Sequence, residues 1–171
     1  MEDRLLIRLC EINESNWLEA VGLTLREDQK QFLDSPLGII ARGYVYRSHR
    51  ARVLGVYSGD SIAGLMLIKD LDEEPACYDL QQFLIDSRFQ GRGFGSRGLE
   101  LLLQMLSKER KYGCVEVCVD ESNFPALRLF EKSGFADTGY TDPDLPDQKI
   151  LRYVFPALDA LDSMDGYIKR F

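Results

Sequence analysis

The sequence contains one histidine, four cysteines and no Cys-x-x-Cys pair. The histidine, His49, stands in a basic stretch away from every cysteine, so we expect no structural or catalytic metal site. A Ser/His/Asp or Cys/His catalytic set is also hard to assemble around a single histidine. The four thiols are therefore interpreted as buried structural groups.

Membrane-spanning and export segments are missing as well. No run reaches about eighteen apolar residues, and the start, Met1 to Arg4, has no basic region followed by an apolar stretch. We expect a soluble, cytoplasmic protein with no membrane partner. Its 28 acidic and 21 basic residues give a net charge of -7. That charge disfavours a nucleic-acid partner and suits a cationic ligand, although acidity also serves solubility alone.

Length and hydrophobic content predict one sizeable core. The chain has 171 residues, of which 45% are hydrophobic, and this suffices for one domain but not for two ordinary ones. We place the domain at residues 1–155 and a C-terminal tail at residues 156–171. Apolar residues recur at helical spacing in the tail, so we expect a helix that packs on the domain or on a second subunit.

Hydrophobic periodicity and turn residues divide the domain into strands and helices. A hairpin is predicted between residues 53–57 and 62–68, because Gly59 and Asp60 separate these two apolar runs. A short helix should follow Asn13. The other predicted strands are 5–9, 78–85, 115–119, 135–141 and 150–155, and the other predicted helices are 26–33, 37–47, 95–106 and 125–132. This order predicts an α/β fold, a single-domain sandwich in which helices flank a mixed central β-sheet.

A turn dense in glycine joins a predicted strand to an amphipathic helix, and it reads Gln90-Gly91-Arg92-Gly93-Phe94-Gly95. Such a turn presents unpaired backbone N–H groups and the positive end of a helix to a phosphate. Glycine suits it, having no Cβ to block approach and tolerating positive φ. We expect a pyrophosphate here. An ordinary strand-to-helix turn is the alternative, and a dinucleotide-binding fold is disfavoured because its turn would follow the first strand.

Two ordered motifs resemble those of the GNAT superfamily of N-acetyltransferases. Residues 81–95 resemble its central acetyl-CoA motif, including the Gln/Arg-x-x-Gly-x-Gly/Ala turn. A second segment resembles the superfamily's next motif and lies at the expected separation; it reads Asn123-x-x-Ala126-x-x-Leu129-Phe130-x-x-x-Gly134-Phe135. Ile62-Ala63-Gly64 in the hairpin also fits, so the resemblance covers residues 4–155. Residues 25–35 look, more loosely, like a segment of bacterial spermine/spermidine (diamine) acetyltransferases.

The resemblance implies how acetyl-CoA would bind. The backbone of Phe83, Leu84 and Ile85 would pair with the pantetheine arm like an added strand, and an N–H near Leu84 would polarise the thioester carbonyl. Asn123 and Ala126 would contact the distal part of the cofactor, although Asn123 is equally well read as a helix cap. The pyrophosphate would be enclosed by Gln90, Gly91, Arg92, Gly93, Phe94, Gly95 and Ser96.

Acetyl transfer to an amine needs a base, because an alkyl ammonium has a pKa near about 10 and must lose a proton first. Asp79 is the first candidate, since the resemblance places an acid on the strand before the cofactor segment; a solvated carboxylate is the alternative. Gln81 occupies the position where animal polyamine acetylases carry an acid. Phe130 replaces the tyrosine that commonly protonates the leaving thiolate, so Tyr140, Tyr78 or solvent would act instead, or the thiolate would leave unaided.

The leading hypothesis is an acetyl-CoA-dependent acetyltransferase acting on the primary amine of a small molecule, with polyamines as the first class to test. Acetylation of protein or peptide amines and a non-catalytic acetyl-CoA-binding module are the alternatives. A homodimer is an expectation from the resemblance alone. Acidic side chains that would either meet a cationic substrate or form solvated faces are Glu27, Asp28, Asp70, Asp72, Glu73 and Glu74.

Overall fold

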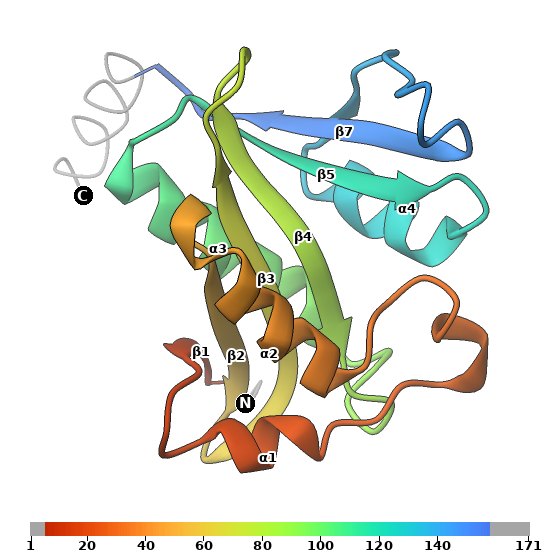
Figure 1. The fold of residues 1–171 in the computed structure, drawn as a ribbon. Helices are drawn as coiled ribbons and strands as arrows, with labels where there is room; N and C mark the ends of the chain where they lie inside the picture. The colour runs from red at the N-terminus through yellow and green to blue at the C-terminus, as the bar shows by residue number, and fades with distance from the viewer. Residues whose placement is uncertain (1–5, 158–171) are drawn as a thin grey trace, which may run out of the picture.

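The structure is a computed structural model, and it describes residues 6–157. Helices lie on both faces of one seven-stranded sheet (Figure 1). The strands are β1 (Ile7–Glu11), β2 (Arg52–Ser58), β3 (Ser61–Leu71), β4 (Cys77–Ile85), β5 (Cys114–Asp120), β6 (Ala136–Asp137) and β7 (Gln148–Val154). The helices are α1 (Trp17–Val21), α2 (Pro36–Val45), α3 (Phe94–Glu109) and α4 (Phe124–Lys132), with single 3-10 turns at Glu27–Gln29 and Arg47–His49. The predicted α/β class is confirmed.

The sheet is mixed, with the strand order β1-β2-β3-β4-β5-β7-β6. All neighbouring strands are antiparallel except β4 and β5, which run parallel. That parallel pairing joins only Tyr78 to Val115 and Asp79 to Glu116. Beyond Asp79 the two strands diverge, as Figure 1 shows, and the sheet opens into a wedge. The functional site is built in this wedge.

Two buried clusters hold helices against the opposite faces of the sheet. Leu99 and Leu106 of α3 belong to one cluster together with Met66 of β3. Ile39 of α2 belongs to the other, together with Leu67. Met66 and Leu67 are successive residues, so they point to opposite faces, as strand geometry requires. Because all five side chains are almost fully buried, each contributes roughly 1.5–3 kcal/mol to the free energy of unfolding.

The predicted hairpin, glycine turn and following amphipathic helix are present, but the predicted helix at residues 26–33 is wrong. Only the turn Glu27–Gln29 is helical there, in 3-10 form. The segment carries no apolar stripe at helical spacing, and packing of such a stripe supplies most helix stability in proteins. Leu25 and Leu33 instead pack against the cluster on the α2 face of the sheet.

The predicted strand at 135–141 is much shorter than expected. It pairs only as Ala136–Asp137, because the Asp137 carboxylate accepts a hydrogen bond from the N–H of Gly139, whose φ is 72°, and this turns the chain out of the sheet. The tail from residue 158 lies outside the described residues, so its helix stays a prediction. No helix within residues 6–157 has the length and apolar character needed to cross a bilayer.

Candidate active site

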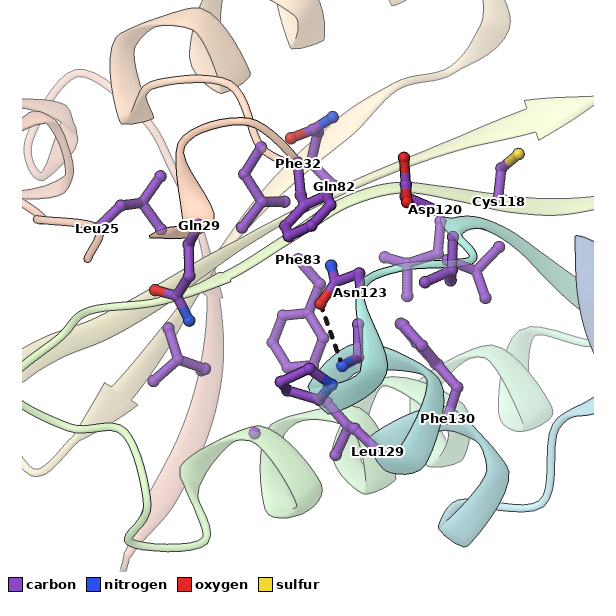
Figure 2. A pocket seen from close by; sticks show the side chains of 18 of the residues that line it. Leu25, Gln29, Phe32, Gln82, Phe83, Cys118, Asp120, Asn123, Leu129 and Phe130 are labelled. Atoms are coloured by element: carbon purple, nitrogen blue, oxygen red, sulfur yellow. Dashed lines mark hydrogen bonds between the residues drawn. The ribbon is translucent and has the colours of Figure 1, made fainter. Parts of the chain in front are cut away.

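The wedge between β4 and β5 contains a cavity of about 480 Å³. Figure 2 shows Leu25 and Gln29 at one side of it, and Cys118 and Asp120 at the other. Its floor and walls come from the diverging strands, from the first turns of α3 and α4, and from the segment between α1 and α2. The lining from β4, β5 and α4 comprises Leu80, Gln81, Gln82, Phe83, Val117, Cys118, Val119, Asp120, Pro125, Ala126, Leu129 and Phe130.

A β-bulge at Gln81 re-aims β4 where it leaves β5. On β3, Ile68 is paired with Leu80 and Leu67 with Gln82, so Gln81 is the extra residue. The bulge reverses the strand's alternation: Leu80 belongs to the buried cluster on the α3 face, whereas Leu84 belongs to the cluster on the α2 face. It therefore frees the edge of β4 from β5 and turns Gln81 into the cavity.

Of the three residues predicted to pair with the pantetheine arm, Phe83 and Ile85 line the cavity. Leu84 is fully buried, and its carbonyl oxygen faces Gly64 on β3. Backbone groups of successive strand residues point to opposite edges. The groups of Phe83 and Ile85 are therefore the ones on the edge of β4 that β5 leaves. The Ile85 carbonyl already accepts from Gln90 at 2.8 Å, so the groups of Phe83 and the N–H of Ile85 are the ones to which an extended ligand could add as a strand.

The glycine turn has the backbone conformation that its sequence requires. Gly91 and Gly93 have φ of 71° and 84°, in the left-handed region, and a Cβ on either would point into open space. Both Cα atoms are thus open to a close ligand. Gly93 precedes the first residue of α3, so the unpaired N–H groups of that helix lie at the turn.

The other predicted turn residues have different surroundings. Gly91 and Gly95 line the cavity. Phe94 is 1% exposed and makes an edge-to-face contact with Phe89 at a centroid distance of 5.2 Å. The Arg92 guanidinium lies over both rings, 5.4 Å from the Phe94 centroid. Phe94 therefore anchors the turn in the core, whereas Arg92 and Ser96 belong to the turn without lining the cavity.

Gln90, predicted to face the pyrophosphate, is partly buried and lines the cavity, but its amide is engaged in hydrogen bonds within the protein. Its Nε2 donates to the carbonyl of Ile85 at 2.8 Å and to Oε1 of Gln29 at 2.7 Å. Its Oε1 accepts from Nε2 of Gln29 at 3.1 Å. Both N–H groups of the amide are engaged, so the Gln90 side chain has no free donor for an anion at this turn.

Asn123 combines the two roles that the sequence left open. It is the N-cap of α4, and its Oδ1 accepts from the N–H of Ala126 at 3.4 Å, the dashed line in Figure 2. Both residues also line the cavity. Phe130, one turn further along α4, is 4% exposed and packs edge-to-face on Phe135. The wall of the cavity at this position therefore carries no hydroxyl.

The predicted catalytic side chains lie beside the cavity and outside its lining. Asp79 occupies the last paired position of β4 and β5; its Oδ2 lies 3.1 Å from the Nζ of Lys69 and accepts from Nε2 of Gln81 at 2.6 Å. Gln81 itself lines the cavity. Tyr140 is 60% exposed and lines a separate hollow of about 180 Å³ with Lys149 and others. Their catalytic roles stay predictions.

Besides Arg26 of the segment between α1 and α2, two ionisable lining residues on β5 were missed by sequence reasoning. Asp120 is the only carboxylate in the cavity lining among residues 6–157. Hydrogen bonds from the side chain and N–H of Ser122 lower the pKa of Asp120, so it is a fixed negative charge at neutral pH. Cys118 is exposed, so the expectation of a buried thiol is wrong there; partial desolvation, assisted by Asp79 and other nearby acids, nevertheless raises the pKa of its thiol. Their only sequence signal was their position on β5, directly before the Asn123 motif.

The acids expected to meet a substrate lie elsewhere or are already paired. Asp70 is buried and ion-paired with Arg50 and Lys111. Asp72 accepts from Arg50 at 2.7 Å and from the hydroxyl of Tyr112, also at 2.7 Å. None of the six candidates lines the cavity. The expectation for Asp70 as a free substrate acid is wrong, because this network ties β3 to the segment after α3.

A model of the acetyltransferase (GNAT) family matches residues 8–135, which is most of the chain. The chain belongs to the acetyltransferase (GNAT) family. This GNAT protein is 26% identical to the spermine/spermidine N(1)-acetyltransferase of Bacillus subtilis (strain 168) over 130 residues, covering 76% of this chain and 78% of the relative. The probable spermine N(1)-acetyltransferase of Bacillus subtilis subsp. natto (strain BEST195) is 25% identical over the same shares. The predicted family and N-acetyltransferase activity are confirmed.

Solved GNAT structures share the fold. The aminoglycoside acetyltransferase AAC(6')-Ib in complex with coenzyme A matches with a TM-score of 0.72 and 16% identity, covering 93% of this chain and 99% of that one. RimL, a ribosomal L7/L12 alpha-N-protein acetyltransferase in complex with coenzyme A, matches with a TM-score of 0.71 and 14% identity, covering 87% of this chain and 94% of that one. At these identities the likeness concerns the fold alone.

Proposed function

We propose that this GNAT enzyme transfers the acetyl group of acetyl-CoA to a primary amine of a small cationic molecule, with polyamines as the leading class. The observation that carries the proposal is the early end of β4–β5 pairing, at Asp79 and Glu116. It opens a cavity that is bordered by a glycine turn suited to phosphate and by an unpaired strand edge suited to an extended arm.

In this proposal the cofactor follows the wedge. The backbone of residues 90–96 binds the pyrophosphate, and the open edge of β4 at Phe83 and Ile85 pairs with the pantetheine arm. Asn123 and Ala126 contact the cofactor from α4. A backbone N–H on the edge of β4 donates to the thioester oxygen and stabilises the negative charge that develops there. No metal takes part.

The acceptor would enter beside β5, where Cys118 and Asp120 face the cavity. The ionised Asp120 carboxylate and the overall charge of -7 attract a cation. The two Bacillus relatives, described as acting on spermine or on spermine and spermidine, support a polyamine as the acceptor. Asp120 would then hold one ammonium group while a neutral amine of the same molecule attacks.

The reaction moves two protons besides the acetyl group. The neutral amine nitrogen attacks the thioester carbon, the C–S bond breaks, coenzyme A leaves as a thiolate, and the nitrogen loses its extra proton to solvent as the amide forms. Asp79 is the proposed acceptor of the ammonium proton through a water molecule, and its hydrogen bond with Gln81 places it next to the cavity. Phe130 supplies no proton. Because the thiol of coenzyme A has a pKa of about 8.5, the thiolate can leave unaided and be protonated by solvent.

A thiol-release assay with acetyl-CoA tests the function against spermine, spermidine, diamines, amino acids, aminoglycosides and a lysine peptide. We expect saturable turnover of the polyamines. Turnover of the peptide alone would refute the proposal and favour protein acetylation. Binding of coenzyme A without turnover of any amine would favour a non-catalytic module.

Variants at Asp79 and Asp120 test the assigned roles. Asp79→Asn should lower kcat about 100-fold near neutral pH with normal coenzyme A affinity, because it removes a general base; a normal rate would remove Asp79 from the mechanism. Asp120→Asn should raise the KM for spermine roughly threefold to tenfold without changing the KM for acetyl-CoA. Asp144→Asn, in an exposed loop, removes the same charge outside the cavity and is the matched control.

A further inference from the structure

The segment between α1 and α2, residues 24–34, is fastened to the cofactor side of the cavity at three places. At its start, the N–H of Thr24 donates to Oδ2 of the buried Asp86 at 2.7 Å. At its end, the N–H of Asp34 donates to Oε1 of Gln82 on β4 at 3.1 Å. In its middle, the hydrogen bonds to the rest of residues 6–157 are those of the Gln29–Gln90 amide pair described above, while Leu25 and Leu33 pack against the sheet. We call residues 24–34 the wall segment.

The amide pair can be made only by two side chains that each donate and accept. Nε2 and Oε1 of both glutamines take part, at 3.1 and 2.7 Å. Oε1 of Gln29 also accepts from the N–H of Arg26 at 3.3 Å, and Nε2 of Gln90 also donates to Ile85. Gln29 thus connects the wall segment, through Gln90, to the end of β4 and to the first residue of the glycine turn.

Leu25, Phe32 and Leu33 of the wall segment line the cavity. Figure 2 shows Leu25 and Phe32 on the side away from Cys118 of β5. Leu25 and Leu33 are also held by packing against the sheet, whereas the N–H of Phe32 donates to the carbonyl of Gln29 at 3.0 Å. The position of Phe32 therefore depends on the bond between Gln29 and the turn on which the pyrophosphate is proposed to bind. A ligand that fixes the turn also fixes Gln90, and with it the wall. Conversely, a wall segment that moves away from Gln90 leaves the cavity without its boundary opposite β5, where the acceptor is proposed to enter.

We infer that Gln29 is a positioning residue that couples the cofactor turn to the amine site. When acetyl-CoA binds the turn, the Gln29–Gln90 pair holds the wall segment in the position that the acceptor requires. This inference rests on the proposed function. It predicts that loss of the pair weakens binding of the amine far more than binding of the cofactor.

A double-mutant cycle tests the coupling with spermine as acceptor. Gln29→Ala should raise the KM for spermine about fivefold to tenfold, the effect of losing one or two hydrogen bonds, with less than a twofold change in the KM for acetyl-CoA. In the Gln90→Ala background, Gln29→Ala should have no further effect. Gln29→Glu keeps the acceptor for Gln90 Nε2 and should restore part of the affinity. Lys30→Ala, an exposed neighbour, is the control.

Additive effects in the cycle, or a lowered melting temperature with unchanged KM values, would overturn the inference. A second measurement needs no acceptor. Coenzyme A should slow amide hydrogen exchange at residues 26–33 in the wild type, and this protection should be lost in Gln29→Ala while coenzyme A still binds. Equal protection in both proteins would refute the coupling even if no amine in the panel is acetylated.

Discussion

Replacing Gly64 by alanine should damage both the sheet and the cofactor site. Gly64 is paired with Ile85 across β3 and β4. A Cβ on Gly64 would lie 2.3 Å from the carbonyl oxygen of Leu84 and 2.8 Å from Cδ1 of Ile85. A side chain can rotate away from such a contact, but a backbone oxygen moves only with its strand. Alanine must therefore push β4 away from β3 by roughly 1 Å to restore an ordinary carbon–oxygen contact near about 3.3 Å.

That displacement sets the expected magnitude. Overpacking a well-packed site costs roughly 1–3 kcal/mol, and weakening one or two of the neighbouring ladder hydrogen bonds adds about 1 kcal/mol each. We expect Gly64→Ala to lower the free energy of unfolding by about 2–4 kcal/mol, measured by urea denaturation with an unchanged m value. Coenzyme A affinity, measured by calorimetry, should fall at least about tenfold because Phe83 and Ile85 move with β4.

Two other glycines provide the controls. A Cβ on Gly113 meets nothing within 4 Å, so Gly113→Ala should stay within about 0.5 kcal/mol of the wild type. A Cβ on Gly98 would lie 3.3 Å from the terminal methyl of Met66 and 3.3 Å from Cγ1 of Val56, side-chain contacts that need to give by only a few tenths of an ångström, so its alanine variant should be intermediate. If Gly64→Ala is as stable as Gly113→Ala and binds coenzyme A normally, the close approach of β3 and β4 is not what shapes the cofactor edge.

Three further predictions concern the turn, a buried carboxylate and a thiol. Gly93→Glu should abolish coenzyme A binding with native circular dichroism, because the new carboxylate enters the phosphate position; retained affinity would contradict that placement. Burial raises the pKa of Asp86, but hydrogen bonds from Arg88 and Thr24 outweigh it and lower the pKa. The ionised Asp86 carboxylate therefore stabilises the folded protein above its unfolded-state pKa of about 3.9. This stabilisation is lost as the pH falls through the lowered pKa of Asp86 in the folded state. Asp86→Asn should therefore cost about 2 kcal/mol in urea unfolding near pH 7 and much less below about pH 3; an equal cost at both would refute this. Iodoacetamide should label the Cys118 thiol more slowly than free cysteine near pH 7, since partial desolvation raises its pKa, and coenzyme A should slow labelling further; labelling as fast as free cysteine would contradict this.

Local chemistry made much of the fold predictable. The turn at Gly59 and the helical spacing of Leu99 and Leu106 each act over a few residues, and the structure contains the expected hairpin and helix. The bulge at Gln81 also had a signal. Two polar residues in succession, Gln81 and Gln82, interrupt the alternation of β4, and the apolar residues resume one position out of phase. Reading that break as a bulge would have predicted where β4 leaves β5.

Pairings across the chain could not be predicted in this way. Gln29 and Gln90 are 61 positions apart, and neither stands in a pattern that identifies its partner. The assignment of the Gln90 side chain to phosphate came from its place in a motif, whereas its amide is engaged within the protein. Asp70 was read as a loop acid for the same reason: its partners Arg50 and Lys111 are distant in sequence, and only the folded chain brings them together.

The wedge forms because β4 and β5 are held together at one end and lead into different helices at the other. At the apex, Tyr78 and Val115 are almost fully buried and the Tyr78 hydroxyl accepts from the N–H of Lys111 at 3.0 Å, so β4 and β5 cannot part there. At the open end, β4 leads through the glycine turn into α3, and β5 leads through the Asn123 cap into α4. Divergence of the strands separates the two helix starts and leaves the edge of β4 free for a ligand. The phosphate site, the strand edge and the α4 contact of the proposed cofactor site are therefore consequences of one structural event, the end of pairing at Asp79.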